Sequence, residues 1–265
     1  MKKSLFLVFT YLVIQLLSTL LVKGAFLGYQ YLHKGLIVSN ISVTEAILSL
    51  ILSIVLMTLF MAWRGLIPLD KESWSLPSPT PSYLLWLIVA TFSSIFFLDF
   101  LMYYLDSLPD LMEQTFNVIL TSFWGIIAVT LLGPFIEELI FRGAITQFLL
   151  EKYNPKVAIL TSALIFGLIH MNPVQIFGGF LMGLFLGWIY YKTRSLLPVL
   201  IIHIVNNSLS VLLGRRYAEV DTLRELFNVN LYWCLVALSI LLLFVSIKQL
   251  NGATVSPFKM EKDRE

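Results

Sequence analysis

The sequence predicts an all-α fold: a polytopic membrane helical bundle of about eight transmembrane helices around an intramembrane cavity. Two observations predict this class. Of the 265 residues, 58% are hydrophobic and only 13% are charged, with a mean hydropathy of +0.86, and the apolar residues gather into long stretches. Soluble domains carry roughly twice that charge fraction. The chain therefore has too few polar side chains to cover a water-facing surface, and lipid must cover much of it.

The helices follow from the apolar stretches, taken in order. A hydrocarbon core roughly 30 Å thick requires about 20 mainly apolar residues for each crossing. Eight stretches meet or approach that length: 5–22, 43–63, 83–105, 117–136, 156–171, 174–191, 196–213 and 231–250. The stretch that starts at 117 continues without a clear break to Leu150. We interpret 5–22 as a span, not a signal peptide, because it is long for a signal sequence and the chain after it is equally apolar.

The eight stretches form one unit. Residues 1–250 are expected to build a single bundle, and residues 251–265 are expected to form a disordered cytoplasmic tail. Within the stretch 174–191, Gly179, Gly183 and Gly187 recur every four residues and share one helical face. Small residues on one face allow a second helix to approach closely.

The basic residues predict the orientation of the bundle. With the N-terminus inside, twelve Lys and Arg residues fall on the cytoplasmic side and five on the other, as expected for short loops. Both termini are therefore expected in the cytoplasm, in a plasma membrane. The short, low-charge chain that begins Met1-Lys2-Lys3 favours a prokaryotic source.

Composition also excludes some classes of protein. The net charge of +2 is close to neutral and the basic residues are scattered, so nothing indicates nucleic-acid binding. Cys234 is the only cysteine, which excludes an intrachain disulfide framework and a cysteine-rich metal site.

A pair of acidic residues lies where lipid-facing residues are expected. Glu137 and Glu138 stand in an apolar stretch, and charged groups inside a span need partners and usually have functions. Glu138 and Arg142 are four residues apart and can form an ion pair on one helical face. Glu137 is rotated about 100° from Glu138 and has no obvious local cation, so it could serve as a general base. The alternative is an interhelical ion pair with a purely structural role.

Two further clusters lie in later spans. His170 ends the segment Phe166-Gly167-Leu168-Ile169-His170, and His203 and Asn207 are four residues apart on one face of 196–213. Each could be structural, because polar side chains also join helices. Together with Glu137 they suffice for water activation and oxyanion stabilisation, or for three zinc ligands with a carboxylate base. Asp99 is another acid inside a span, with a role in the cavity or in packing.

The three clusters resemble a known family. Glu137-Glu138-x-x-x-Arg142, Phe166-x-x-x-His170 and His203-x-x-x-Asn207 resemble, in order and spacing, the motifs of the CAAX-protease and bacteriocin-processing (CPBP, Abi) intramembrane proteases. The motif region covers about 117–213. The resemblance implies an eight-helix bundle and hydrolysis of a peptide bond in a lipidated or hydrophobic peptide.

The resemblance also implies roles for the residues. Glu137 and His170 would activate the attacking water, His203 and Asn207 would stabilise the oxyanion, and Glu138 and Arg142 would support the site. The family includes zinc-dependent and metal-free schemes. Having two histidines favours the metal-free scheme, in which no cofactor is needed; if zinc is present, its ligands are Glu137, His170 and His203.

Three functions remain open at this point. The first is an intramembrane endopeptidase whose partners are membrane lipid and a hydrophobic or lipidated peptide. The second is a non-catalytic membrane regulator or bacteriocin-immunity protein of the same family. The third is an ion-coupled transporter, for which no inverted repeat is visible.

One geometric conflict remains: straight helices place Glu137 near the cytoplasmic end of its span and His170 near the opposite end of the next. We expect the helix boundaries to differ so that the two residues can meet.

Overall fold

The computed structural model describes residues 1–35, 42–76, 80–105, 107–217 and 223–252. Within these ranges the chain is helical and contains no strand, as predicted. The helices are α1 (Lys2–Lys34), α2 (Val43–Trp63), α3 (Pro81–Tyr103), α4 (Glu113–Ile119), α5 (Phe123–Ile127), α6 (Gly133–Ile140), α7 (Gln147–Leu150), α8 (Pro155–Leu168), α9 (Pro173–Thr193), α10 (Leu196–Arg216), α11 (Leu223–Leu226) and α12 (Val229–Gly252). A short 3₁₀ helix, η1 (Glu72–Trp74), and two π-helical segments, η2 (Ala128–Leu132) and η3 (Phe141–Thr146), complete the described elements.

Seven of the described helices are long and apolar enough to cross a membrane, close to the predicted eight. The one that falls short is α8, which was predicted as 156–171 but has only 14 residues. The protein is an integral membrane protein, because lipid must cover the apolar side chains that these helices leave exposed.

Helix boundaries differ from the prediction at three other places. The stretch predicted from 117 is split, because Ser122 is extended and separates α4 from the long helix that begins at Phe123. Helix α1 runs on to Lys34, and α12 includes Asn251 and Gly252, which were assigned to the tail. The rest of the predicted tail, 253–265, lies outside the described residues.

Local signals explain where the helices begin. Ser42 and Glu45 form a capping box at the start of α2. The side chains of Thr80 and Asn154 accept hydrogen bonds from the first turns of α3 and α8, each of which begins with proline. Proline suits this position because its missing N–H would have no helical partner there.

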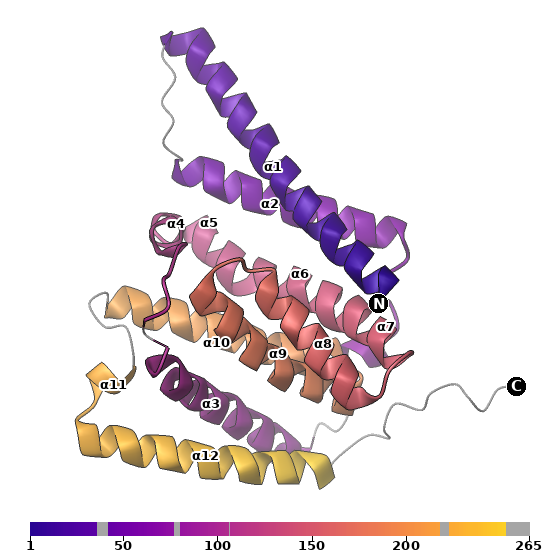
Figure 1. The fold of residues 1–265 in the computed structure, drawn as a ribbon, viewed down its shortest axis with the longest axis vertical. Coiled ribbons are helices and arrows are strands. Elements are labelled where there is room, and N and C mark those ends of the chain that lie inside the picture. Colours follow the sequence, from indigo (N-terminus) through magenta and orange to yellow (C-terminus); the bar gives the residue numbers. More distant parts are fainter. Residues whose placement is uncertain (36–41, 77–79, 106, 218–222, 253–265) are drawn as a thin grey trace, which may run out of the picture.

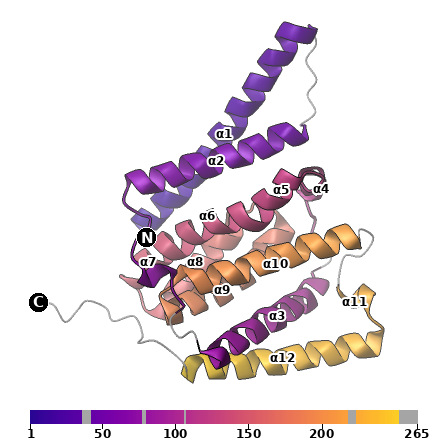
Figure 2. The same cartoon turned by 180° about the vertical axis from the view of Figure 1, so that it is seen from behind.

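The helices pack in three groups (Figures 1 and 2). One side is formed by α1 and α2, and the opposite side by α3 and α12. Between them lie α8, α9, α10 and one continuous helix of 28 residues, from Phe123 to Leu150, that includes α5, α6, α7 and both π-helical segments. The middle group carries all three sequence motifs.

The predicted glycine stripe on α9 is confirmed as a packing surface. A Cβ at Gly179, Gly183 or Gly187 would lie 3.0–3.4 Å from atoms of the preceding segment, among them Ala163 and Ile159 of α8. The two helices therefore approach at backbone distance, and this contact sets the position of the turn that joins them.

Candidate active site

The acidic pair lies near the middle of the long helix. In the π-helical segment η2, the N–H of Gly133 donates to the carbonyl of Ala128, five residues earlier. In that register the donor for the carbonyl of Val129 would be residue 134. Residue 134 is a proline and has no N–H. The Val129 carbonyl is therefore left to another donor, immediately beside the carboxylates of α6.

Asn207 of α10 supplies that donor. Its Nδ2 donates to the Val129 carbonyl at 3.1 Å, and its Oδ1 accepts a hydrogen bond from Asn206 Nδ2 at 3.2 Å. These two bonds fix the plane of the Asn207 amide and leave one of its two N–H hydrogens unused.

Glu138 and Arg142 form the predicted ion pair, deep inside the bundle. Arg142 Nη1 donates to Glu138 Oε1 at 2.9 Å, and the two side chains are only 1% and 2% exposed. Arg142 Nη2 also donates to the carbonyl of Gly183 at 3.3 Å, and the guanidinium lies 4.6 Å from the centre of the Phe166 ring. A buried charge needs such compensation, because each ion loses several kcal/mol of hydration.

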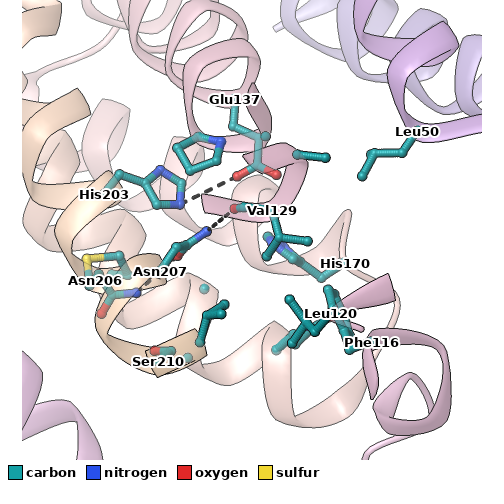
Figure 3. Close-up of a pocket in the computed structure, with 18 of the residues that line it drawn as sticks. Leu50, Phe116, Leu120, Val129, Glu137, His170, His203, Asn206, Asn207 and Ser210 are labelled. Atoms are coloured by element: carbon teal, nitrogen blue, oxygen red, sulfur yellow. Dashed lines mark hydrogen bonds and ion pairs between the residues drawn. The ribbon is translucent and has the colours of Figure 1, made fainter. Parts of the chain in front are cut away.

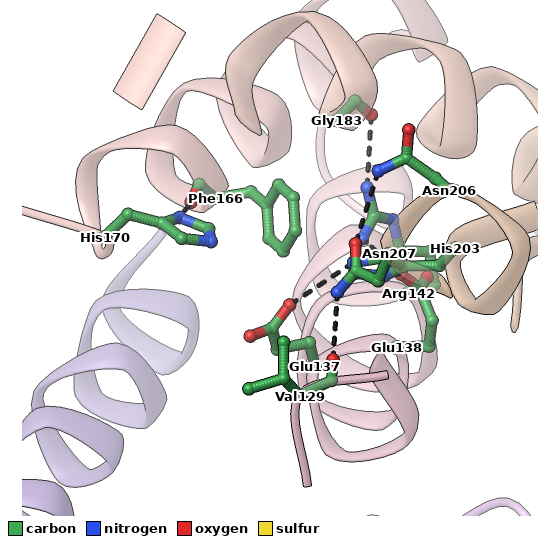
Figure 4. A network of polar contacts seen from close by, with 10 residues as sticks. All are labelled: Val129, Glu137, Glu138, Arg142, Phe166, His170, Gly183, His203, Asn206 and Asn207. Carbon is green, nitrogen blue, oxygen red and sulfur yellow. Dashed lines mark hydrogen bonds and ion pairs between the residues drawn. The ribbon is translucent and has the colours of Figure 1, made fainter. Parts of the chain in front are cut away.

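His203 connects this buried pair to Glu137. Its Nδ1 donates to Glu138 Oε1 at 2.7 Å, and its Nε2 faces Glu137 Oε2 at 3.6 Å (Figure 4). Glu137 thus has a neighbour that can carry positive charge, supplied by α10 and not by its own helix. The Glu137 side chain keeps 18% exposure, unlike Glu138.

His170 lies in the turn between α8 and α9. Its Nδ1 donates to the carbonyl of Phe166 at 2.8 Å, because a carbonyl can only accept. This bond leaves Nε2 as a possible acceptor on the neutral ring. Met171 follows with a positive φ of 51° and ends the helix. Asn172 then secures the turn: it accepts from the N–H of Leu111 and donates to Asp110 Oδ1.

The course of the long helix resolves the conflict over depth, because this helix continues past Glu137 to Leu150 instead of ending at residue 136. Counted from the connection between α7 and α8, Glu137 lies about 20 Å back along the long helix, at 1.5 Å per residue, and His170 lies about 22 Å forward along α8. The two residues therefore reach a similar depth. The expected change of boundaries is what brings them together.

A cavity of about 550 Å³ joins these residues. Glu137, His170, His203 and Asn207 all line it (Figure 3). Glu138 and Arg142 do not line it and lie behind Glu137 and His203 (Figure 4). Its remaining wall comes from α2, α4, η2, α9 and α10, including Leu50, Phe116, Leu120, Asn206 and Ser210.

The same geometry bears on the alternative zinc site. Across the described ranges, no three His, Cys, Asp or Glu side chains converge closely enough to hold a metal ion. His203 Nδ1 is also engaged by Glu138. As they lie here, Glu137, His170 and His203 do not form a ligand set.

Several residues in the site were not assigned a role from the sequence. Asn206 orients Asn207, and Phe166 contacts both histidine rings, at 5.2 and 5.9 Å between ring centres. Both residues lie inside the motif segments, so their location in the sequence could have indicated that they belong to the site.

Asp99, in contrast, does not line the cavity. Its carboxylate accepts hydrogen bonds from the Leu223 N–H at 3.0 Å and from the Tyr232 hydroxyl at 3.3 Å. Its role is to hold the connection into α12.

The fold and the site together define an integral membrane protein with a polar cavity inside its helical bundle, and two comparisons show which known proteins its motif segment resembles. Residues 117–209 match the type II CAAX prenyl endopeptidase Rce1-like family. The resemblance inferred from the three motifs is therefore confirmed for the segment that carries them.

A curated relative agrees with this assignment. The Bacillus subtilis (strain 168) protein named "Putative membrane peptidase YdiL" is 32% identical over 98 residues. The matched region covers 36% of this chain and 40% of that protein, so well under half of either is compared. No solved structure matches the chain. Both descriptions name a peptidase.

Proposed function

We propose that the chain is an intramembrane endopeptidase that hydrolyses a peptide bond in a membrane-associated or hydrophobic peptide. The observation that carries this proposal is the convergence of Glu137, His170, His203 and Asn207 on one cavity. A carboxylate and a neutral imidazole can activate a water molecule. An imidazole N–H and an amide N–H can donate hydrogen bonds that stabilise an oxyanion.

Glu137 acts as the general base in this proposal. It removes a proton from a water molecule while the water oxygen attacks the carbonyl carbon of the peptide. His170 assists, because its Nε2 is free to accept a hydrogen bond from the same water once Nδ1 is bound to Phe166. The remaining exposure of Glu137 keeps its carboxylate accessible from the cavity.

His203 and Asn207 stabilise the oxyanion that forms. When His203 is protonated, Glu138 offsets its charge through Nδ1, and Nε2 becomes a donor toward the cavity. Asn207 contributes its unused N–H. As the C–N bond breaks, the carboxyl group of Glu137 gives its proton to the leaving nitrogen, so the products are a carboxylic acid and an amine.

The catalytic type belongs to the same proposal. No step above requires a metal, and the enzyme is proposed to use a glutamate and a water molecule. Purified protein should then retain activity in the presence of a chelator and contain no stoichiometric zinc by elemental analysis. Activity that is lost with a chelator and restored by zinc would instead indicate the metalloprotease scheme.

The cellular setting follows from the charge distribution and the relative. We place both termini in the cytoplasm, in the plasma membrane of a prokaryote, because the basic residues favour that orientation and the curated relative is bacterial. The substrate is expected to be a hydrophobic peptide without a prenyl group.

Comparative peptidomics tests the activity and identifies substrates together. Membranes from cells with the wild-type protein are compared with membranes containing Glu137→Gln. The variant should lose at least about 100-fold in cleavage, the usual contribution of a general base, with unchanged insertion. Glu151→Gln is the matched control, because Glu151 is an exposed glutamate directly after the same long helix. A full set of cleavage products from Glu137→Gln would overturn the proposal and favour a non-catalytic regulator.

A further inference from the structure

A second cavity lies away from the candidate active site, at the N-terminal end of α1. It has a volume of about 400 Å³ and is formed where this end of α1 meets the C-terminal end of α2 and the segment α7 (Figure 1). None of its lining residues lines the larger cavity. The site is therefore separate from the proposed chemistry.

The polar wall of this cavity is wholly cationic. Lys2, Lys3 and Arg64 line it, and no acidic residue does. None of the three takes part in an ion pair found among the described residues. The first turn of α1 has no acidic residue either, and the free N–H groups of a helix N-terminus add positive partial charge. The local charge therefore selects an anion.

The other wall of the cavity is apolar. Lys3 Nζ lies 5.5 Å from the centre of the Phe148 ring, and Phe6 is 56% exposed on the outer surface of α1. The remaining apolar lining is Leu7, Phe60 and Leu66. A free inorganic anion would gain nothing from such a wall, whereas the first carbons of an acyl chain would bury apolar surface against it.

We propose that this cavity binds the phosphate group of an anionic phospholipid, with its acyl chains lying along α1 and α2. The cations lie at the ends of two membrane-spanning helices, which is the depth of a headgroup. Basic pockets between transmembrane helices on the cytoplasmic side are suited to anionic headgroups. Lys2, Lys3 and Arg64 all fall on the side that the charge distribution assigns to the cytoplasm, so the lipid comes from the inner leaflet.

Native mass spectrometry of the delipidated full-length protein tests the proposal. Phosphatidylglycerol, phosphatidylcholine and inorganic phosphate are added separately in the same detergent, and retained adducts are counted. Phosphatidylglycerol should be retained and should raise the thermal midpoint, while phosphatidylcholine should do neither. A shift of equal size from inorganic phosphate alone would overturn the lipid assignment in favour of a free anion.

Charge-neutral variants locate the site. Each cation that is lost should weaken phosphatidylglycerol retention about fivefold, the effect of one basic residue near a lipid surface. Arg64→Gln is made alone, because Lys2 and Lys3 also guide insertion, and then together with Lys2→Gln and Lys3→Gln. The matched control is Lys156→Gln, Lys192→Gln and Lys248→Gln, which removes three charges assigned to the same side but outside the cavity. Equal retention by wild type and both Arg64→Gln variants would overturn the proposal, as would an equal loss in the control.

Discussion

Arg142 connects all three sequence motifs through one buried side chain. It binds Glu138 within its own motif, its guanidinium lies over Phe166 of the second, and Glu138 in turn accepts from His203 of the third. It also reaches the Gly183 carbonyl on α9. Its removal would leave Glu138 as a buried charge with only a histidine beside it.

Replacing Arg142 should therefore destabilise the bundle strongly. Arg142→Met is expected to lower the free energy of unfolding by about 3–5 kcal/mol, the usual cost of breaking a buried ion pair from one side. The double variant Glu138→Gln with Arg142→Met should recover much of that loss, because no charge is left unpaired. Unfolding in mixed micelles with increasing SDS measures both. A double variant less stable than Arg142→Met alone would contradict this explanation.

At this scale the sequence predicted contacts within a helix better than contacts between helices. The pair of Glu138 and Arg142 follows from a spacing of four residues, and the structure confirms it. The contact of His203 with both glutamates depends on where α10 packs, which spacing along the chain does not determine. The catalytic roles themselves stay predictions, since placement in a cavity does not measure chemistry.

The π-helical segment η2 is the element that links backbone geometry to the proposed oxyanion site. Pro134 leaves the Val129 carbonyl without a main-chain donor, and Asn207 uses that carbonyl to fix its amide. In Pro134→Ala, residue 134 or, in a regular α-helical register, Gly133 would donate to Val129 and compete with Asn207. Catalytic turnover should fall roughly tenfold, less than the 10²–10³-fold lost when an oxyanion donor is removed outright.

A second proline variant distinguishes the loss of the Asn207 contact from a general effect of replacing a proline in a helix. Pro155→Ala changes the first residue of α8, where proline replaces no hydrogen bond, and should leave turnover unchanged. Kinetics with one peptide substrate compare the two variants. Full turnover in Pro134→Ala would show that Asn207 does not depend on a free Val129 carbonyl.

Hydropathy predicted well which segments of the chain form helices, but it predicted the lengths of those helices less well. Most predicted boundaries agree within a few residues, because long apolar stretches are a local property of the sequence. The end of α8 was missed because Ile169 and Met171 are apolar and carry no signal for the end of a helix. The positive φ of Met171 and the bonds of Asn172 to the loop before α4 arise only in the folded chain. The start of the long helix was missed for a similar reason: the break at Ser122 carries no strong sequence signal.

For the whole molecule, the path of the chain predicts that both termini share one side of the membrane. The helices α8 and α9 form a hairpin that starts and ends on the membrane side where Leu150 lies, so this hairpin leaves the chain on the same side. The other long helices are α1, α2, α3, the helix Phe123–Leu150, α10 and α12, and they make an even number of crossings. Reporter fusions at the N-terminus and after Gly252 should both be active in the cytoplasm, and a fusion after Arg216 should be active outside. Termini on opposite sides would contradict this path.

The early end of α8 also concerns the supply of the second substrate of any hydrolase, which is water. Irregular backbone is tolerated at membrane depth only where it is buried in protein or lines a hydrated space. The turn around Met171, with that side chain 68% exposed, lies at about the depth of Glu137 and borders the cavity through His170. A full-length α8 would have carried an unbroken, lipid-compatible surface past this level. The shortened helix instead places the polar backbone of this turn beside the cavity, where a hydrated interior would satisfy its hydrogen bonds.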